Sequence, residues 1–228
     1  MLGAAALLAG TGQAAARYEA TITRTTFGIP HIQAKDFGGL GFGAAYAEAQ
    51  DNICLMADAY VSAAGKRSKF FGADTDGLIG IWTAKNIDSD LFYRSVPDIT
   101  KLRGIFAQQS PAYRALIDGR VAGYNRFLKD QKDKLPTQCA GQSWVGAITR
   151  DDVLQSVNGF SMLSSSLSLA SRIVNAAPPT DTVARRAAVA ADPTDIPVWA
   201  ALGSNGWAFG GDAVAGGTGL VVGNPHFP

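Results

Sequence analysis

Ser204 and His226 are the residues of this sequence whose types and positions suit nucleophilic chemistry. Ser204 follows Gly203 where a stretch of alanine, proline and charged residues gives way to the strand-like segment SNGWAFGG. A serine hydroxyl attacks a carbonyl group efficiently only when a nearby base removes its proton. No G-x-S-x-G sequence surrounds any serine of the chain, so the sequence predicts no nucleophile elbow.

Cleavage of the bond between Gly203 and Ser204 would create the missing base. The freed α-amino group of a serine has a reference pKa of about 7.7–8.0, so it accepts the hydroxyl proton near neutral pH, whereas an amide nitrogen does not. The segment before Ser204 would then be a spacer that is removed.

A β-hairpin is the element expected to position both residues. The segments SNGWAFGG and GLVVGN flank a glycine-rich turn, Ala213–Gly219. If the turn is centred near Ala215, residues whose numbers sum to about 430 lie opposite each other. The numbers of Ser204 and His226 sum to 430, so these two residues are expected to face each other. An alternative stays open on spacing alone, in which His226 merely ends a strand. The other histidine, His31, lies near the opposite end of the chain.

Helices and a first hairpin are expected before this region. Strand, turn and strand are predicted between Tyr18 and Ile32. From Phe42 to Ala63, apolar side chains recur at intervals of three and four, which predicts a helix ended by Gly65. The glycines of GGLGFG, residues 38–43, lack the spacing of a dinucleotide-binding motif and are interpreted as sites of close backbone packing.

Two further helices have recognisable starts. One begins at Ser110-Pro111, an N-cap followed by proline, and the other begins at Thr149, which forms an approximate capping box with Asp152 and carries an apolar face. The members of that face are Val153, Val157 and Phe160. The neighbouring pair Asp151-Asp152 is interpreted as complementing the helix dipole rather than as binding a cation.

Composition excludes several classes of function. The chain has 228 residues, of which 47% are hydrophobic and 17% charged, and a formal net charge of +1, as in an ordinary globular protein. Its scattered basic residues argue against a nucleic-acid partner. No apolar run reaches the roughly 20 residues of a membrane-spanning helix.

The N-terminal segment is typical of exported proteins. Residues 1–16 combine an apolar stretch with the small residues of a signal-peptide cleavage site before Arg17. The positively charged residues that usually begin a signal peptide are absent, so the signal peptide is expected to be truncated at its start. In an exported chain, the two cysteines, Cys54 and Cys139, are expected to form a disulfide, whereas in a cytosolic chain they would be free thiols.

Several separate segments, in order, resemble the penicillin acylase family of N-terminal nucleophile hydrolases, in particular its acyl-homoserine-lactone acylase and aculeacin A acylase members. They are TRTTFGIPHIQAKDF, NIDSDLFYR, VAGYNRFL, QCAGQSW, GSNGWAFGG and GNPHFP. The resemblance covers nearly the whole chain from Tyr18, except the alanine- and proline-rich linker.

This resemblance implies a secreted or periplasmic precursor that cuts itself. It implies a mostly helical α chain at 17–175, ending somewhere between 171 and 179, a spacer at 176–203 and the start of a β chain at 204–228. Gly203 and Ser204 would form the autocleavage site, with Ser204 the catalytic nucleophile and His226 near its α-amino group. Phe227 would border the acyl-chain pocket, and Asn205 would give structural support. Cys54 and Cys139 match positions that such α chains pair.

The fold implied is α+β, a four-layer αββα sandwich that is incomplete here. No cofactor is required, but some members bind calcium, with one ligand near Asp151. The partners implied are a small N-acyl amide substrate and the remainder of the β chain. The oxyanion-hole donors are expected beyond Pro228, so the chain is expected to be an inactive fragment.

The function implied for the full-length protein is hydrolysis of a linear amide, which removes a long acyl chain from acyl-homoserine lactones or acylated cyclic peptides. One alternative is a penicillin or cephalosporin acylase. A secreted binding module without catalysis, with a linker sensitive to proteolysis, is the alternative from another class.

Overall fold

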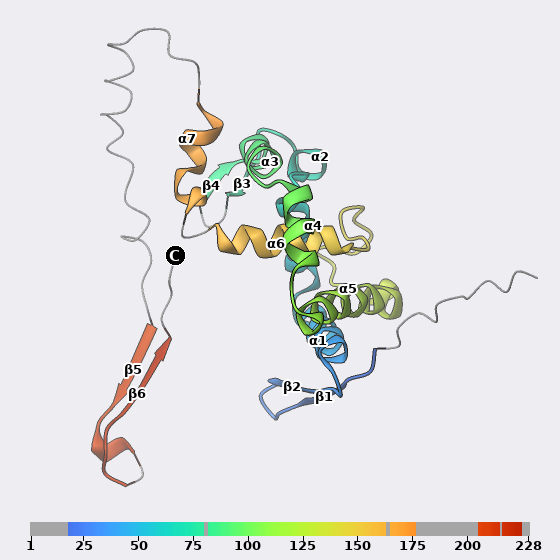
Figure 1. The fold of residues 1–228 in the computed structure, drawn as a ribbon. Coiled ribbons are helices and arrows are strands. Elements are labelled where there is room, and N and C mark those ends of the chain that lie inside the picture. Colours follow the sequence, from blue (N-terminus) through green and yellow to red (C-terminus); the bar gives the residue numbers. More distant parts are fainter. Residues whose placement is uncertain (1–17, 80–81, 163–164, 177–204, 215, 225–228) are drawn as a thin grey trace, which may run out of the picture. The chain divides into compact units, whose positions relative to one another are not determined.

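The computed structural model describes residues 18–79, 82–162, 165–176, 205–214 and 216–224. Within these ranges the chain forms helices and three separate two-stranded antiparallel sheets (Figure 1). The chain divides into two compact units. The first comprises the residues up to Ile53 together with Gln109–Leu135, and the second comprises Cys54–Gln108 and the residues from Pro136 onward.

The first unit contains a hairpin, the first part of a long helix and a second helix. Strand β1 (Thr21–Arg24) pairs with β2 (Pro30–Gln33), which confirms the predicted hairpin. Gly28 in the turn has a φ of +82°, a conformation that glycine adopts without steric strain. Helix α5 (Pro111–Gln131) is followed by the 3-10 helix η1 (Lys132–Lys134).

Helix α1 (Phe37–Ala63) runs from the first unit into the second and ends where the sequence predicts. It begins before the expected start at Phe42, because the side chain of Asp36 accepts a 2.7 Å hydrogen bond from the backbone N–H of Gly39 in the first turn. Asn52 has φ −139° and ψ 27°, which interrupts the helical geometry.

Glycines allow α1 and α5 to approach closely. A Cβ atom on Gly41 of α1 would lie 2.1 Å from the carbonyl oxygen of Leu116, and one on Gly123 of α5 would lie 2.1 Å from that of Phe42. Both neighbours are backbone atoms, which cannot move aside as a flexible side chain can. The interpretation of GGLGFG as a packing segment is therefore confirmed.

The second unit is mostly helical. Its core cluster joins α3 to β3 and to the chain around η2, and consists of Ile79, Phe92, Tyr93, Met162, Leu167 and Ala170. Its elements in chain order, after the end of α1, are α2 (Arg67–Phe71), β3 (Asp76–Ile79), β4 (Trp82–Lys85), α3 (Asn86–Ser95), α4 (Ile99–Ala107), α6 (Arg150–Ser161), η2 (Ser166–Leu169), α7 (Ala170–Val174), β5 (Asn205–Phe209), η4 (Gly211–Ala213) and β6 (Leu220–Asn224).

The predicted helix starts at Ser110 and Thr149 are confirmed. The Ser110 hydroxyl accepts a 3.2 Å hydrogen bond from the backbone N–H of Tyr113. At the start of α6, the backbone N–H of Asp152 donates to the Thr149 hydroxyl at 3.4 Å, and the backbone N–H of Thr149 donates to the Asp152 carboxylate at 2.7 Å. Both hydrogen bonds of a capping box are therefore present. Asp152 bonds the backbone N–H of the N-cap residue although its side chain is shorter than the glutamate usual at this position.

The secondary structure combines helices with small hairpins. Each sheet in the described ranges has two strands, so the four-layer sandwich stays a prediction. None of the helices in those ranges is both long and apolar enough to cross a membrane.

Candidate functional site

The hairpin expected to carry the nucleophile is present. Strand β5 pairs antiparallel with β6, from Asn205 opposite Asn224 to Phe209 opposite Leu220. The numbers of opposite residues therefore sum to 429, one less than expected. Because side chains alternate between the two faces of a strand, a register shift of one residue changes which side chains face each other.

The residues predicted to perform the chemistry are not among those that the structure describes. Gly203, Ser204, His226 and Phe227 lie outside the described residues, so their roles stay predictions. Asn205 is the first residue of β5, immediately after the predicted nucleophile. The described structure therefore gives the strand that follows Ser204, but not the serine itself.

The hairpin is neither paired nor covered by other strands in the described part of the chain. Within the described residues, no third strand pairs with β5 or β6. The apolar side chains of the hairpin are also open to solvent, with 75% of Val221 exposed and over two-fifths of each of Phe209, Leu220 and Val222. An isolated two-stranded hairpin is only marginally stable in water.

The disulfide expected between Cys54 and Cys139 is confirmed. It links the last part of α1 to the segment before α6, and the two cysteines are 85 positions apart in sequence. Cys139 is completely buried. The bond therefore closes a long loop that contains α2 to α5.

Asp151 is engaged by an arginine. Arg103 of α4 donates from Nε to Asp151 Oδ1 at 3.1 Å, and its Nη2 donates to Oδ2. The hydrogen bonds from Arg103 hold the pKa of the Asp151 carboxyl below its usual range, and the bonds to Asp151 raise the pKa of Arg103. A calcium ion would have to compete with this guanidinium. No cluster of three or more His, Cys, Asp or Glu side chains suited to a metal occurs in the part of the chain that is described, so calcium binding stays a prediction.

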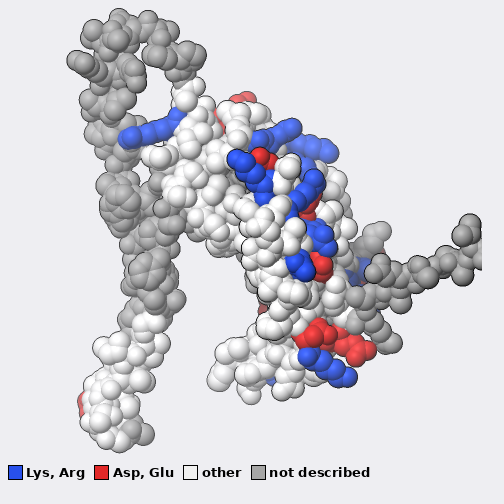
Figure 2. Space-filling model, in the orientation of Figure 1, with Lys and Arg blue, Asp and Glu red and all other residues white. Residues whose placement is uncertain are grey.

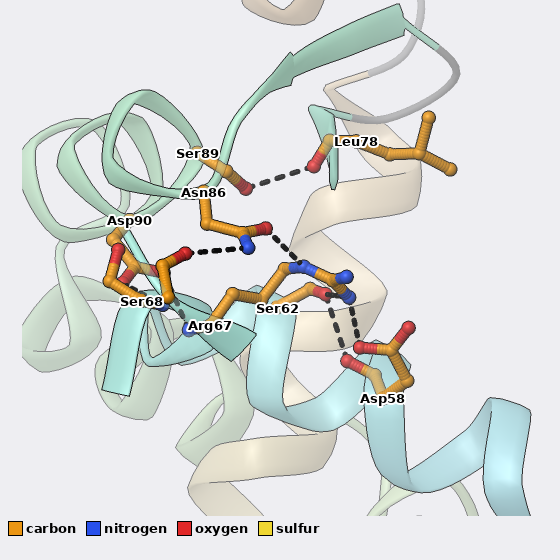
Figure 3. A network of polar contacts seen from close by, with 9 residues as sticks. Asp58, Ser62, Arg67, Ser68, Leu78, Asn86, Ser89 and Asp90 are labelled. Atoms are coloured by element: carbon orange, nitrogen blue, oxygen red, sulfur yellow. Dashed lines mark hydrogen bonds and ion pairs between the residues drawn. The ribbon is translucent and has the colours of Figure 1, made fainter. Parts of the chain in front are cut away.

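A buried polar network holds the elements of the second unit together (Figure 3). Asn86, which is fully buried, donates from Nδ2 to the carbonyl oxygen of Gly72 at 2.9 Å and accepts from Nε of Arg67 at 2.8 Å. The guanidinium of Arg67 also forms an ion pair with Asp58 and a 3.2 Å hydrogen bond to Ser62, both in α1. The network therefore links α1, α2 and α3.

The same network fixes the start of α2 and the end of β3. The carboxylate of Asp90 accepts from the backbone N–H groups of Arg67 at 2.7 Å and Ser68 at 2.8 Å. The Ser89 hydroxyl donates to the carbonyl oxygen of Leu78 at 2.9 Å. All of these bonds are made by the first two turns of α3, which the segment NIDSDLFYR forms.

An apolar groove of about 340 Å³ lies beside this network. Its apolar wall comes from α1, β3, α3 and α6, and includes Leu55, Ala59, Leu78, Tyr93 and Phe160. The Asp58–Arg67 ion pair also lines the groove, together with the residues Ser62 and Ser156. Pockets of this size with a few polar groups are typical of small-molecule sites, so the groove can receive an apolar chain.

The groove was not foreseen from the sequence. Val153, Val157 and Phe160 were expected on one apolar face of α6, but only Val153 is buried, whereas 40% of Val157 and 74% of Phe160 are exposed. The spacing of three and four residues predicts that these side chains lie on one side of the helix. It does not predict how much of that side other elements cover. Asn86 and Asp90, four residues apart on α3, were the available signal for the buried network.

The sequence is similar to one protein family and to characterised acylases. The sequence model of the penicillin amidase family matches residues 19–228. The acyl-homoserine lactone acylase PvdQ of Pseudomonas savastanoi pv. phaseolicola is 37% identical over 236 residues, which cover 100% of this chain and 29% of that protein. The aculeacin-A acylase of Actinoplanes utahensis is 35% identical over 221 residues, which cover 92% of this chain and 28% of that protein.

The fold is similar to that of a solved acylase. A thermostable penicillin G acylase from Alcaligenes faecalis superposes with a TM-score of 0.54 and 23% sequence identity, over 76% of this chain and 84% of that chain. The chain spans less than a third of the length of the curated relatives.

Proposed function

Because the chain belongs to the penicillin amidase family, we propose that the full-length protein is an acylase, which hydrolyses the amide bond between a long acyl chain and the amine part of its substrate. The observation that carries the proposal is the match of the family across residues 19–228, which includes Gly203, Ser204 and the strand that follows them. The names of the two relatives favour acyl-homoserine lactones or acylated cyclic peptides as substrates.

Self-cleavage is the first proposed step. The Ser204 hydroxyl oxygen attacks the carbonyl carbon of Gly203, the bond between that carbon and the Ser204 nitrogen breaks, and the nitrogen takes up a proton. Water then hydrolyses the resulting ester, which releases the Gly203 carboxylate and restores the hydroxyl. Glycine at position 203 leaves the attacked carbonyl unshielded by a side chain.

Amide hydrolysis follows the same chemistry. The free α-amino group of Ser204 accepts the hydroxyl proton as the oxygen attacks the substrate carbonyl, and the proton passes to the leaving amine. Water then attacks the acyl-enzyme ester and releases the carboxylic acid. We assign His226 to the neighbourhood of this amino group, and Phe227 to the mouth of the acyl pocket.

The groove beside α6 supports an acyl substrate. Leu55 and Phe160 are 70% and 74% exposed, so an apolar chain laid against them would remove two large apolar side chains from water. Burial of apolar surface gains about 25 cal/mol per Å². We therefore propose that this groove receives part of the acyl chain.

The remainder of the β chain is the proposed partner of the hairpin. The unpaired edges of β5 and β6 and the exposed side chains of Val221 and Leu220 support additional strands on this sheet. These strands would also bring the oxyanion-hole donors.

Export is proposed on the basis of the disulfide. Structural disulfides persist in oxidising compartments and are rare in the cytosol, so the Cys54–Cys139 bond supports a periplasmic or secreted protein. Residues 1–16, the predicted signal peptide, lie outside the described residues.

An activity assay on the full-length protein tests the proposal. Ser204→Ala should abolish release of the free amine from an acyl-homoserine lactone, whereas Ser95→Ala, which changes an exposed serine at the end of α3, should leave it unchanged. Amine release by the Ser204→Ala variant at the wild-type rate would rule out the proposed nucleophile.

A further inference from the structure

A second hollow, of about 470 Å³, has three cationic side chains in its wall. Lys66 precedes α2, Lys69 lies within it and Arg94 lies near the end of α3, and all three are exposed. Figure 2 shows Lys and Arg side chains, with some Asp and Glu side chains between them, over the part of the surface that α2, α3 and α4 form. Three of the cations, Lys66, Lys69 and Arg94, line the hollow itself.

No carboxylate among the described residues forms an ion pair with these cations. Asp90 is the acid in the wall, but it is 7% exposed and its two oxygens already accept the backbone N–H groups of Arg67 and Ser68. Across the described ranges, Lys66, Lys69 and Arg94 form no ion pair. Three positive charges and one negative charge leave the wall with a net charge of +2.

The cationic side chains are held in place by their neighbours. Gly65 is buried and has a φ of +60°, and a Cβ atom on it would lie 2.5 Å from Cγ of Arg94, so the stem of Arg94 packs directly against this glycine. The ammonium group of Lys69 lies 5.1 Å from the ring centroid of Phe70. Contacts of this kind lower the entropy that the side chains would lose on binding a ligand.

The wall also contains an unsatisfied donor. The hydroxyl oxygen of Ser68 is buried and has no hydrogen-bond partner among the residues described. Buried hydroxyl groups nearly always have a partner, so an exception calls for an explanation. An oxyanion in the hollow would offer acceptors on the side where the three cations lie.

We propose that this hollow binds a phosphate-type oxyanion. Its tetrahedral oxygens suit several N–H and O–H donors that converge from α2 and α3. Ile87 and Leu91, which are 49% and 48% exposed, add an apolar part to the wall. The same chemistry is offered by free inorganic phosphate and by the phosphodiester headgroup of an anionic lipid. The inference is independent of the acylase proposal, because none of its residues belongs to the catalytic hairpin.

Binding is tested on the full-length protein with two probes. Radiolabelled inorganic phosphate is measured by equilibrium dialysis, and vesicles of phosphatidylcholine with or without phosphatidylglycerol are measured by co-sedimentation. The test variant is K66Q/K69Q/R94Q. The matched control is K35Q/K101Q/K129Q, which removes the same charge from exposed lysines outside the hollow.

We expect saturable binding of at least one probe, weakened up to about fivefold per cation removed, so up to about a hundredfold in the test triple variant, and little changed in the control. Phosphate binding identifies a free anion as the source, and binding to phosphatidylglycerol vesicles alone identifies a lipid headgroup. The single variants K66Q and K69Q, at exposed positions, serve if the triple variant misfolds, and each should lose up to about fivefold. Failure to bind either probe, or an equal loss in both triple variants, overturns the proposal.

Discussion

Replacement of Asn86 by alanine should destabilise the second unit by about 1–3 kcal/mol. Asn86 is fully buried, and its side-chain amide bonds both the carbonyl oxygen of Gly72 and Nε of Arg67. Each partner left unsatisfied in a buried position costs about 1–3 kcal/mol, and more when it is charged. Gly72 is exposed, so water can bond its carbonyl oxygen, and the stranded guanidinium of Arg67 gives the range above, before any contribution from the space that the shorter side chain leaves.

Urea unfolding of the full-length protein, followed by tryptophan fluorescence, measures this effect. Trp144 lies 5.3 Å from Phe71 of α2 between ring centroids, so its emission reports on the neighbourhood of the network. The matched control is Asn175→Ala, which removes a 2.8 Å hydrogen bond to the backbone carbonyl of Ser171 at an exposed site. The control should change the free energy of unfolding by no more than about 0.5 kcal/mol.

A double-mutant cycle separates the two bonds of Asn86. In combination with Arg67→Met, the loss caused by Asn86→Ala should be smaller than in the wild-type background, with a coupling energy of about 0.5–3 kcal/mol, because the stranded guanidinium is then absent. Equal effects of Asn86→Ala and Asn175→Ala on the unfolding midpoint would refute the view that this network fixes α2 to α3.

Three other outcomes follow from the structure. Removal of the disulfide by Cys54→Ser with Cys139→Ser should lower the free energy of unfolding by about 4–5 kcal/mol in the chain-entropy model, because the closed loop spans 85 residues; an unchanged urea midpoint would contradict this. The lowered pKa of Asp151 means that its ion pair stabilises the fold above the ordinary carboxyl pKa of about 4 and that this contribution is lost as the pH falls through the lowered value. Asp151→Asn should therefore lessen the loss of stability on acidification, measured as the steepness of acid unfolding, and a profile as steep as that of the wild type would count against the pair. Phe160→Ala should lower kcat/KM for a substrate with a long aliphatic acyl chain by about tenfold but hardly affect one with a short chain; equal losses for both would argue against an acyl-binding groove.

Local patterns in the sequence were sufficient for several of the elements, although not for α2, α3, α4, α7 or the β3–β4 hairpin. The end of α1 at Ala63, the start of α5 after Ser110 and the cap at Thr149 depend on neighbouring residues, and each is found where it was predicted. The disulfide was also predicted, because export, if it occurs, leaves one possible pairing for two cysteines. These features need no knowledge of what packs against them.

Features that depend on distant contacts were not predictable in this way. Phe160 lies on the apolar side of α6 yet is exposed, because none of the described elements extends over it. Asn86 is polar yet fully buried, because Arg67 and Gly72 satisfy its amide from another part of the chain. The β5–β6 register differs by one residue from the expected one, since it depends on the conformation of the ten residues between the strands.

The mature N-terminus of the β chain tests the central claim most directly. Intact-mass analysis and N-terminal sequencing of the active full-length protein should give a chain that begins at Ser204, and the Ser204→Ala variant should remain a single unprocessed precursor. An active enzyme whose bond between Gly203 and Ser204 is intact would contradict the account.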